Sequence, residues 1–289
     1  MIPTIKKRLS AYEKPKKKAF SLKYPWSLKF VIFIKRLLTS ARNLLTLGFR
    51  LKREAYLPCI LARHSSLLYR KLGDTDQGLQ INKVKNLQIA IGLIDGLVIP
   101  PHKTFSLWHH LGATTKARGY VDGLVLSEGN PAQAIGGGLC QLANFLFWIF
   151  LHTDVKVVER HYHSVDAFPD SGRTIPFGSG ATIYYNYLDL KIKNISDQSL
   201  QIKLWLTDSQ LKGQIRSDKP ALKKFHLKEA NHYFVKHKHR YFRYNEIHRE
   251  TFIKGKKVKD EEIIKNFAPV KYAVNKDYLK ANEFKILEF

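Results

Sequence analysis

The sequence predicts an α+β domain in which a buried helix packs on an antiparallel sheet, with a basic helical extension at the N-terminus. Three glycines, Gly136 to Gly138, precede the almost wholly apolar run 139–151, which is typical of a tight loop leading into a buried helix. Over 188–193 and 200–206, leucine and isoleucine alternate with other residues. This pattern indicates two strands with one covered face, joined by a turn over 194–199.

Composition and charge suggest how the chain is divided. With 289 residues and 44% hydrophobic content, the chain can bury a core and is not of the disordered class. Lysine and arginine outnumber acidic residues by 15 to 2 over 1–54, by 14 to 12 over 55–209 and by 20 to 10 over 210–289. We therefore expect a basic amphipathic extension (1–54), a core domain (55–209) and a basic C-terminal extension of that same domain (210–289).

The N-terminal extension combines cations with the apolar stretch from Trp26 to Phe49. Such a helix can lie on an anionic membrane surface or dock on the protein core, and the sequence leaves both open. Lys35, Arg36 and Arg42 interrupt any membrane span, and no secretory signal is evident, so we expect a cytoplasmic chain that can lie peripherally at the inner membrane face. No nucleic-acid motif accompanies the positive charge, so no specific nucleic-acid partner is expected.

Before the glycine run, apolar periodicity predicts one helix over 51–72 and a second over 82–94. The second helix should end at Asp95-Gly96, and residues 97–99 then resemble a short strand that Pro100-Pro101 stops. Cys59 lies in the first of these stretches and is assigned no role. The chain has only one further cysteine, Cys140, which is in keeping with a reducing compartment.

The candidate chemistry centres on Cys140, in the first turn of the predicted buried helix. Unpaired N–H groups and the helix dipole at that position are expected to lower the thiol pKa. The β-branched run from Val155 to Ser164 predicts a strand whose alternation places Glu159, His161 and His163 on one face. A thiol beside an imidazole suits a hydrolase or acyltransferase, one thiolate with two imidazoles suits zinc, and a buried cysteine can also be plain packing.

Four blocks of sequence carry a resemblance to a known family: 100–108 (PPHKTFSLW), 136–150 (GGGLCQLANFLFWIF), 158–163 (VERHYH), and 181–183 with 188–190. In this order and spacing the chain resembles the VanW family, which is associated with vancomycin resistance. The resemblance implies a bacterial cell-wall setting, peptidoglycan or its precursors, rather than a particular reaction. The chain departs from the family pattern at His102-Lys103. It also departs at Gly180, where relatives carry an aspartate that could orient a histidine.

The sequence therefore leads to two functional hypotheses for an accessory protein of peptidoglycan metabolism or glycopeptide resistance. In the first, a Cys-His hydrolase or acyltransferase acts on cell-wall precursors, with Cys140 as nucleophile, His161 or His163 as base, and Gln141 or nearby backbone N–H groups stabilising an oxyanion. Its expected substrate contacts are Gly136, Gly137, Gly138, Glu159 and Arg160. In the second, a noncatalytic protein binds a precursor or partner at the inner membrane face. No cofactor is expected, with zinc at Cys140, His161 and His163 as an alternative.

Overall fold

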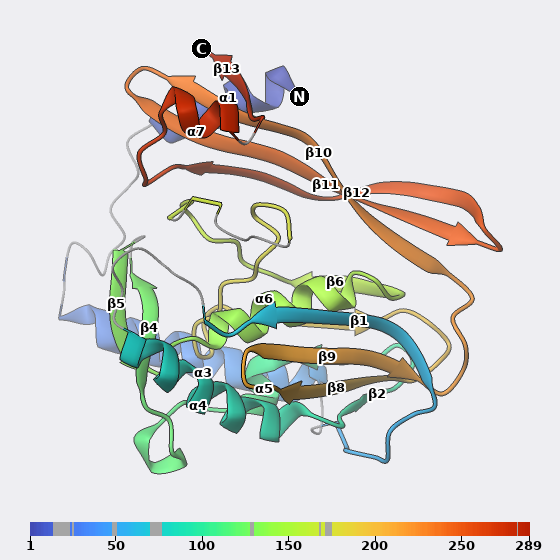
Figure 1. Ribbon diagram of the computed structural model, residues 1–289. Helices are drawn as coiled ribbons and strands as arrows, with labels where there is room; N and C mark the ends of the chain where they lie inside the picture. Colours follow the sequence, from blue (N-terminus) through green and yellow to red (C-terminus); the bar gives the residue numbers. More distant parts are fainter. Residues whose placement is uncertain are drawn as a thin grey trace.

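The computed structural model describes residues 1–13, 24, 26–47, 51–69, 77–127, 130–167, 169–170, 175–281 and 283–289. Helices and mainly antiparallel sheets make up these residues, so the predicted α+β class is confirmed. Figure 1 shows a core built from the elements α3 to β9 and, above it, a sheet built from the last quarter of the chain together with helix α1. No helix in the described ranges is both long enough and apolar enough to cross a membrane.

The core contains two small sheets and a hairpin. The first sheet has the strand order β1-β9-β8-β2, the second has the order β3-β7-β6, and β4 pairs with β5. All these pairings are antiparallel. Their bounds are β1 Cys59–Leu67, β2 Val98–Ile99, β3 Thr104–Ser106, β4 Asp122–Ser127, β5 Asn130–Ile135, β6 Val155–Glu159, β7 Lys191–Asn194, β8 Leu200–Leu206 and β9 Gln210–Ser217.

Helix α6 (Leu139–Phe150) is the centre of the core. Nine of its side chains are buried, and it contacts β1, β9 and helix α4 (Gln77–Ile94). Because apolar residues surround the helix on nearly all sides, it lacks a solvated face, as its sequence suggests. Helix α4 ends one residue before Asp95, where Gly96 takes a positive φ of 78°. The core also holds a short helix, α5 (Leu107–Leu111), and a 3-10 turn at Lys116–Arg118.

The predicted helix over 51–72 is wrong. Residues 59–67 form β1, which pairs along its length with β9, and residues 70–72 lie outside the described residues. Pro58 stands immediately before the strand and favours extended backbone at the residue that precedes it. The apolar residues whose spacing predicted a helix belong instead to an edge strand that contacts α6. The pairing with β9, which is distant in sequence, makes this segment a strand.

The two alternating segments after residue 187 do form strands, β7 and β8, but they belong to different sheets. The side chain of Asn194 accounts for this arrangement, since its amide donates to the carbonyls of Ile99, Pro100 and Gln198 at 3.0, 3.2 and 2.8 Å. The chain is thereby fixed where it leaves one sheet and enters the next. A hairpin between β7 and β8 is therefore absent from this fully described stretch.

The last quarter of the chain forms a separate sheet of order β12-β11-β10-β13, in which only β13 runs parallel to its neighbour. N-terminal helix α1 (Ile2–Glu13) packs Ile5 and Leu9 onto this sheet (Figure 1). Ile247 and Ile264 join the sheet to the main core cluster. The remaining bounds are β10 Lys224–His237, β11 Arg240–Ile253, β12 Lys256–Pro269, α7 Lys276–Ala281 and β13 Lys285–Glu288.

The three-part division by charge stays a prediction. Its first boundary falls between helix α3 (Ser27–Leu47) and β1, so that α1 and α3 lie in the basic extension. Its second boundary, after residue 209, falls directly before β9, which lies between β1 and β8 in the core sheet. In Figure 1, α3 lies at the level of the core, below the C-terminal sheet.

Candidate functional site

The glycine run lies against a neighbouring hairpin where side chains do not fit. Gly138 precedes α6 in a left-handed conformation with φ of 95°, which glycine adopts most readily. A Cβ added to Gly137 would lie 2.1 Å from the backbone of Gly123 in β4. The side chain of Asn86 in α4 donates to the Gly137 carbonyl at 2.9 Å and holds the loop in place. The contacts within the chain explain the glycines without a ligand.

Cys140 occupies the first turn of α6, as predicted, and the residue is half-buried. Burial raises the pKa of its thiol, and a hydrogen bond with the backbone of Ile183 opposes the rise only in part. The expected lowering of this pKa is therefore wrong. The helix N-terminus favours a thiolate, but the loss of solvent around the sulfur outweighs it because burial disfavours any charged form.

The two histidines do not share a strand. β6 ends at Glu159, and His161 makes only an isolated bridge to Thr182. His161 Nε2 lies 3.1 Å from Glu159 Oε1, in agreement with their predicted common face, whereas His163 Nδ1 lies 2.9 Å from Thr182 Oγ1. The predicted strand from 155 to 164 is thus too long, because the chain turns to pair with the segment 181–183 instead of continuing along β7.

Segment 180–183 lies beside the first turns of α6. Asn144 of α6 accepts a hydrogen bond from the Ala181 N–H at 2.6 Å. Cys140, which lies one turn before Asn144 in the same helix, forms a hydrogen bond with the backbone of Ile183. His163 contacts this segment through the Thr182 hydroxyl. The structure therefore brings Cys140 and His163 to one short segment.

Two further predicted site residues are engaged within the protein. Gln141 donates its amide to Ser66 Oγ at 3.0 Å and to the Leu67 carbonyl at 2.7 Å, which ties α6 to β1. Arg160 donates to the carbonyls of Gly178 and Gly180 and stacks over Phe147 at 4.9 Å. Desolvation lowers the pKa of the Arg160 guanidinium to about 10. These contacts position a loop and a helix, and the predicted substrate roles of Gln141 and Arg160 stay predictions.

A cavity of about 500 Å³ with charged and apolar lining residues opens beside Glu159 and His161, between α3 and the β3-β7-β6 sheet. Its volume lies in the usual range of about 300–1,000 Å³ for small-molecule sites. Helix α3 provides one wall, and β6, β7 and the turn before β7 provide the other. The lining residues are Thr39, Arg42, Thr46, Leu47, Thr104, Val158, Glu159, His161, Tyr187, Asp189 and Lys191.

The cavity wall formed by the sheets is a network of charges. Lys191 Nζ lies 2.9 Å from Glu159 Oε2, and the N–H of Asp189 donates to Glu159 Oε1 at 3.0 Å. Burial would raise the pKa of Glu159, but the bonds from Lys191 and His161 outweigh it and leave the pKa lowered. Glu159 therefore stays ionised and holds Lys191 and His161 at the cavity.

Asp189 lies deeper and supports the wall from behind. Its carboxylate accepts from Ser106 Oγ at 2.5 Å and from the N–H groups of Trp108 and Leu190 at 3.1 and 2.8 Å. Burial raises the pKa of Asp189 in spite of these bonds. With its oxygens occupied by the protein, Asp189 fixes the start of β7, while groups nearer the opening remain available to a ligand.

Arg42 provides positive charge on the α3 side of the cavity. The side chain is exposed, and within the described ranges no hydrogen bond or ion pair of its guanidinium is found. Its neighbours in the cavity include the hydroxyls of Thr39, Thr46 and Tyr187. A guanidinium beside several hydroxyls can hold a carboxylate or a phosphate together with neutral polar groups.

Sequence reasoning identified Glu159 and His161 but missed the rest of this cavity. Asp189 lies in the Leu188-Asp189-Leu190 block that carried the family resemblance, which was a usable signal. Lys191 follows two residues later, so strand alternation would have placed its side chain on the same side as that of Asp189. The α3 residues gave no signal, because only the fold brings a helix of the extension against β6 and β7.

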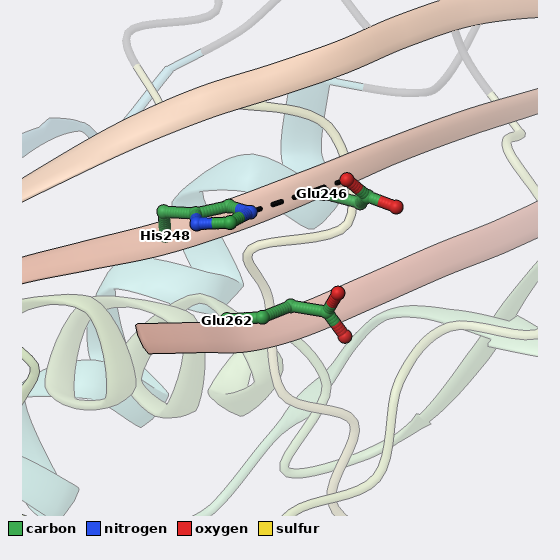
Figure 2. Close-up of side chains that lie close together, drawn as sticks. All are labelled: Glu246, His248 and Glu262. Carbon is green, nitrogen blue, oxygen red and sulfur yellow. Dashed lines mark ion pairs between the residues drawn. The ribbon is translucent and has the colours of Figure 1, made fainter. Parts of the chain in front are cut away.

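A group of three side chains of metal-ligand type lies on the C-terminal sheet. Figure 2 shows Glu246 and His248 of β11 with Glu262 of β12, and their ligand atoms lie within 4.8 Å of one another. Lys265 Nζ lies 3.6 Å from a carboxylate oxygen of Glu246 and 2.8 Å from one of Glu262, so the lysine ammonium already forms ion pairs with both carboxylates. Cys140, His161 and His163 form no such group in the described part of the chain, and zinc there stays a prediction.

We expect the Cys140 thiol to react slowly with iodoacetamide at neutral pH, because burial raises its pKa and only the thiolate is nucleophilic. The measurement is the alkylation rate against pH in a Cys59→Ser background, where Cys140 is the single thiol. Unfolding in denaturant should restore ordinary reactivity and serves as the control. An apparent pKa below about 8.5 in the folded protein would contradict the expectation.

Comparison with known proteins identifies the class to which this fold and site belong. A family model described as VanW like protein matches residues 82–216, which include the glycine run, Cys140, both histidines and Asp189. Vancomycin B-type resistance protein VanW of Enterococcus faecalis is 34% identical over 196 residues, covering 68% of this chain and 71% of that protein. The chain belongs to the VanW family, as its motifs indicated.

A more distant relative is the uncharacterized protein YoaR of Bacillus subtilis, which is 26% identical over 121 residues. That alignment covers 41% of this chain and 37% of YoaR. No solved structure matches the chain.

Proposed function

We propose that this protein contributes to glycopeptide resistance by binding an anionic cell-wall precursor in the cavity between α3 and the β3-β7-β6 sheet. The resistance setting comes from the name of the relative in Enterococcus faecalis. The observation that carries the binding role is the cavity, in which ionised Glu159 fixes Lys191 and His161 and the Arg42 guanidinium has no partner among the described residues.

The contacts around the cysteine favour binding over catalysis. A raised thiol pKa leaves little nucleophile at neutral pH, and the amide of Gln141 is already committed to β1. The glycine run is likewise explained by its packing against Gly123. In this proposal Cys140 and the glycines build the core, and ligand contact falls to the cavity residues.

The chemistry of the cavity suits the chemistry of wall precursors. Muramyl peptides carry free carboxylates, their nucleotide-linked forms add a pyrophosphate, and their sugars present many hydroxyls. Arg42 can bind a carboxylate or phosphate in a bidentate manner. Thr39, Thr46 and Tyr187 can bond hydroxyls or amides of the same molecule. A cavity of about 500 Å³ accommodates one end of such a molecule and leaves the remainder in solvent.

The test is calorimetric titration of the whole chain with a soluble nucleotide-linked muramyl pentapeptide. We expect Arg42→Gln to weaken binding about tenfold or more, the effect of losing a charge-assisted contact. Lys29→Gln is the matched control, because it removes one positive charge from the same helix at an exposed position outside the cavity. Absence of binding, or an equal loss in both variants, would refute a specific site at Arg42.

One observation favours a Cys-His hydrolase or acyltransferase as the second candidate function. Cys140 bonds the backbone of Ile183 and His163 bonds the side chain of Thr182, so the thiol and an imidazole adjoin one segment. A general base next to the thiol would offset its burial. The alkylation experiment decides between the candidates, since fast labelling that slows in a His163→Ala variant supports catalysis and slow labelling in both supports binding.

A further inference from the structure

Helix α3 turns its apolar side away from the protein. Five large apolar side chains, four in α3 and one at the residue just before it, recur at helical spacing and form a single stripe. Their exposed fractions lie between 56% and 78%, far above those of core residues. This outer stripe consists of Trp26 (78%), Phe30 (64%), Phe33 (61%), Leu37 (56%) and Leu44 (67%). Leu38 and Leu45, 63% and 86% exposed, widen it.

The opposite side of α3 faces the core with polar groups. Arg36, Thr39 and Asn43 recur at helical spacing on that side, and Asn43 is buried. Arg36 Nε donates to the Tyr185 carbonyl at 3.3 Å, and its guanidinium stacks over the Tyr185 ring at 5.2 Å. The helix is therefore attached mainly by hydrogen bonds and cation–π contacts, whereas a surface helix normally buries its apolar stripe.

Two more bonds hold α3 in this orientation. Lys35 Nζ donates to Tyr187 Oη at 3.3 Å and lies 4.6 Å from the centre of the Tyr187 ring. Ser40 Oγ accepts from the Asn186 amide at 2.7 Å. Both contacts involve the turn before β7 that also borders the cavity. These contacts hold the polar side of α3 against the core. The apolar side chains of the outer stripe therefore stay exposed when the helix is docked on the protein.

Charge decides which partner the outer stripe fits. Residues 1–54 carry 15 lysines and arginines against 2 acidic residues, and the whole chain has a net charge of +25. A second copy of this chain would bring the same positive charge to the interface and be repelled, whereas an anionic bilayer attracts it. Aromatic and leucine side chains flanked by cations are the composition of helices that lie in the membrane interface.

We propose that the outer stripe of α3 binds the surface of an anionic phospholipid bilayer, with the helix lying in the plane of the interface. Lys29, Lys35 and Arg42 on the same helix disfavour insertion across the bilayer. If the cavity binds a wall precursor as proposed above, Thr39, Arg42 and Thr46 place its wall on the membrane-bound helix. The ligand would then be taken from the membrane surface, where lipid-linked precursors lie.

The test is flotation of the full chain with vesicles of phosphatidylglycerol and phosphatidylcholine, and with vesicles of phosphatidylcholine alone. No wall precursor is present, so the result does not depend on the cavity. We expect binding to the anionic vesicles, reduced about tenfold or more when Phe33→Gln and Leu37→Gln are combined. Leu222→Gln is the control, since Leu222 is 86% exposed and lies outside α3. All these changes keep the charge constant.

Tryptophan fluorescence provides a second measurement that does not require separation. Trp26 is 78% exposed, whereas Trp108 and Trp148 are buried and Trp205 is half-buried outside α3. Anionic vesicles should therefore shift the emission to shorter wavelength in the wild type but not in Trp26→Phe. Absence of vesicle binding would overturn the proposal, as would binding that the double glutamine variant leaves unchanged. A stable dimer in solution that this variant dissociates would assign the stripe to a second copy instead.

Discussion

Replacing Arg243 by methionine is expected to lower the free energy of unfolding by about 3–5 kcal/mol, because the buried Asp166 carboxylate and the half-buried Asp170 carboxylate would lose their cation. Arg243 lies in β11 and its side chain is 1% exposed. Nη1 stands 3.2 Å from Asp166 Oδ2 and 3.0 Å from Asp170 Oδ1, and Nη2 donates to the other oxygen of Asp170. Chemical denaturation, followed by circular dichroism, measures the change.

The surroundings of Arg243 show why methionine cannot compensate. Three aromatic rings, those of Phe177, Phe234 and Phe284, lie 4.8–5.3 Å from the guanidinium and exclude water from the ion pairs. Burial would lower the pKa of Arg243, but the two aspartates outweigh it and leave the pKa raised. The guanidinium thus stays charged in the folded protein and joins the segment 166–170 to the C-terminal sheet.

A control variant separates this effect from the loss of any positive charge. Lys257→Met removes a half-exposed lysine that pairs with Glu250 at 3.2 Å, and it should cost about 1 kcal/mol or less. An Arg243→Met deficit no larger than that of Lys257→Met would contradict this account.

The sequence was most informative where local signals agree. The run from Gly136 to Leu151 predicts both a tight loop and a buried helix, because glycine conformation and apolar content depend only on neighbouring residues. The same holds for the end of α4 at Gly96, whose positive φ of 78° stops a helix. The α+β class follows from these elements and from the alternation in β8.

Predictions that depend on pairing between distant segments failed. β1 is a strand because it meets β9, about 150 residues later, and the apolar spacing of its sequence carries no trace of that partner. β7 and β8 pair with different strands because Asn194 fixes the chain between the sheets. The lowered thiol pKa was a local inference from the helix N-terminus, and burial among distant residues reversed it.

The cavity was only half predictable for the same reason. Glu159 and His161 lie two residues apart, so strand alternation placed them together, and the 3.1 Å contact agrees with that placement. Arg42 reaches the cavity from a helix more than a hundred residues away. Amphipathic periodicity identified α3 but not its orientation, because a helical pattern does not say which side the rest of the protein will cover.

Gly137→Ala is expected to destabilise the protein by about 3 kcal/mol, at the upper end of the usual cost of overpacking. The added methyl would lie 2.1 Å from the carbonyl carbon and oxygen of Gly123, and these backbone atoms cannot rotate aside. Relief requires that β4 separate from the loop, yet Asn86 bonds both sides, at the Val121 and Gly137 carbonyls. The movement would also displace the start of α6, so alkylation of Cys140 should accelerate.

Gly92→Ala is the matched control for this prediction, because it adds the same methyl group at a glycine of α4 that has no atom within 4 Å of the new carbon. It should stabilise the protein by about 0.5–1 kcal/mol, the advantage of alanine over glycine inside a helix. Equal unfolding free energies for the two variants would show that the loop yields without cost. In that case the packing against Gly123 would not explain the glycine run. The first alternative explanation to test would be that a ligand backbone approaches Gly136, Gly137 and Gly138 closely.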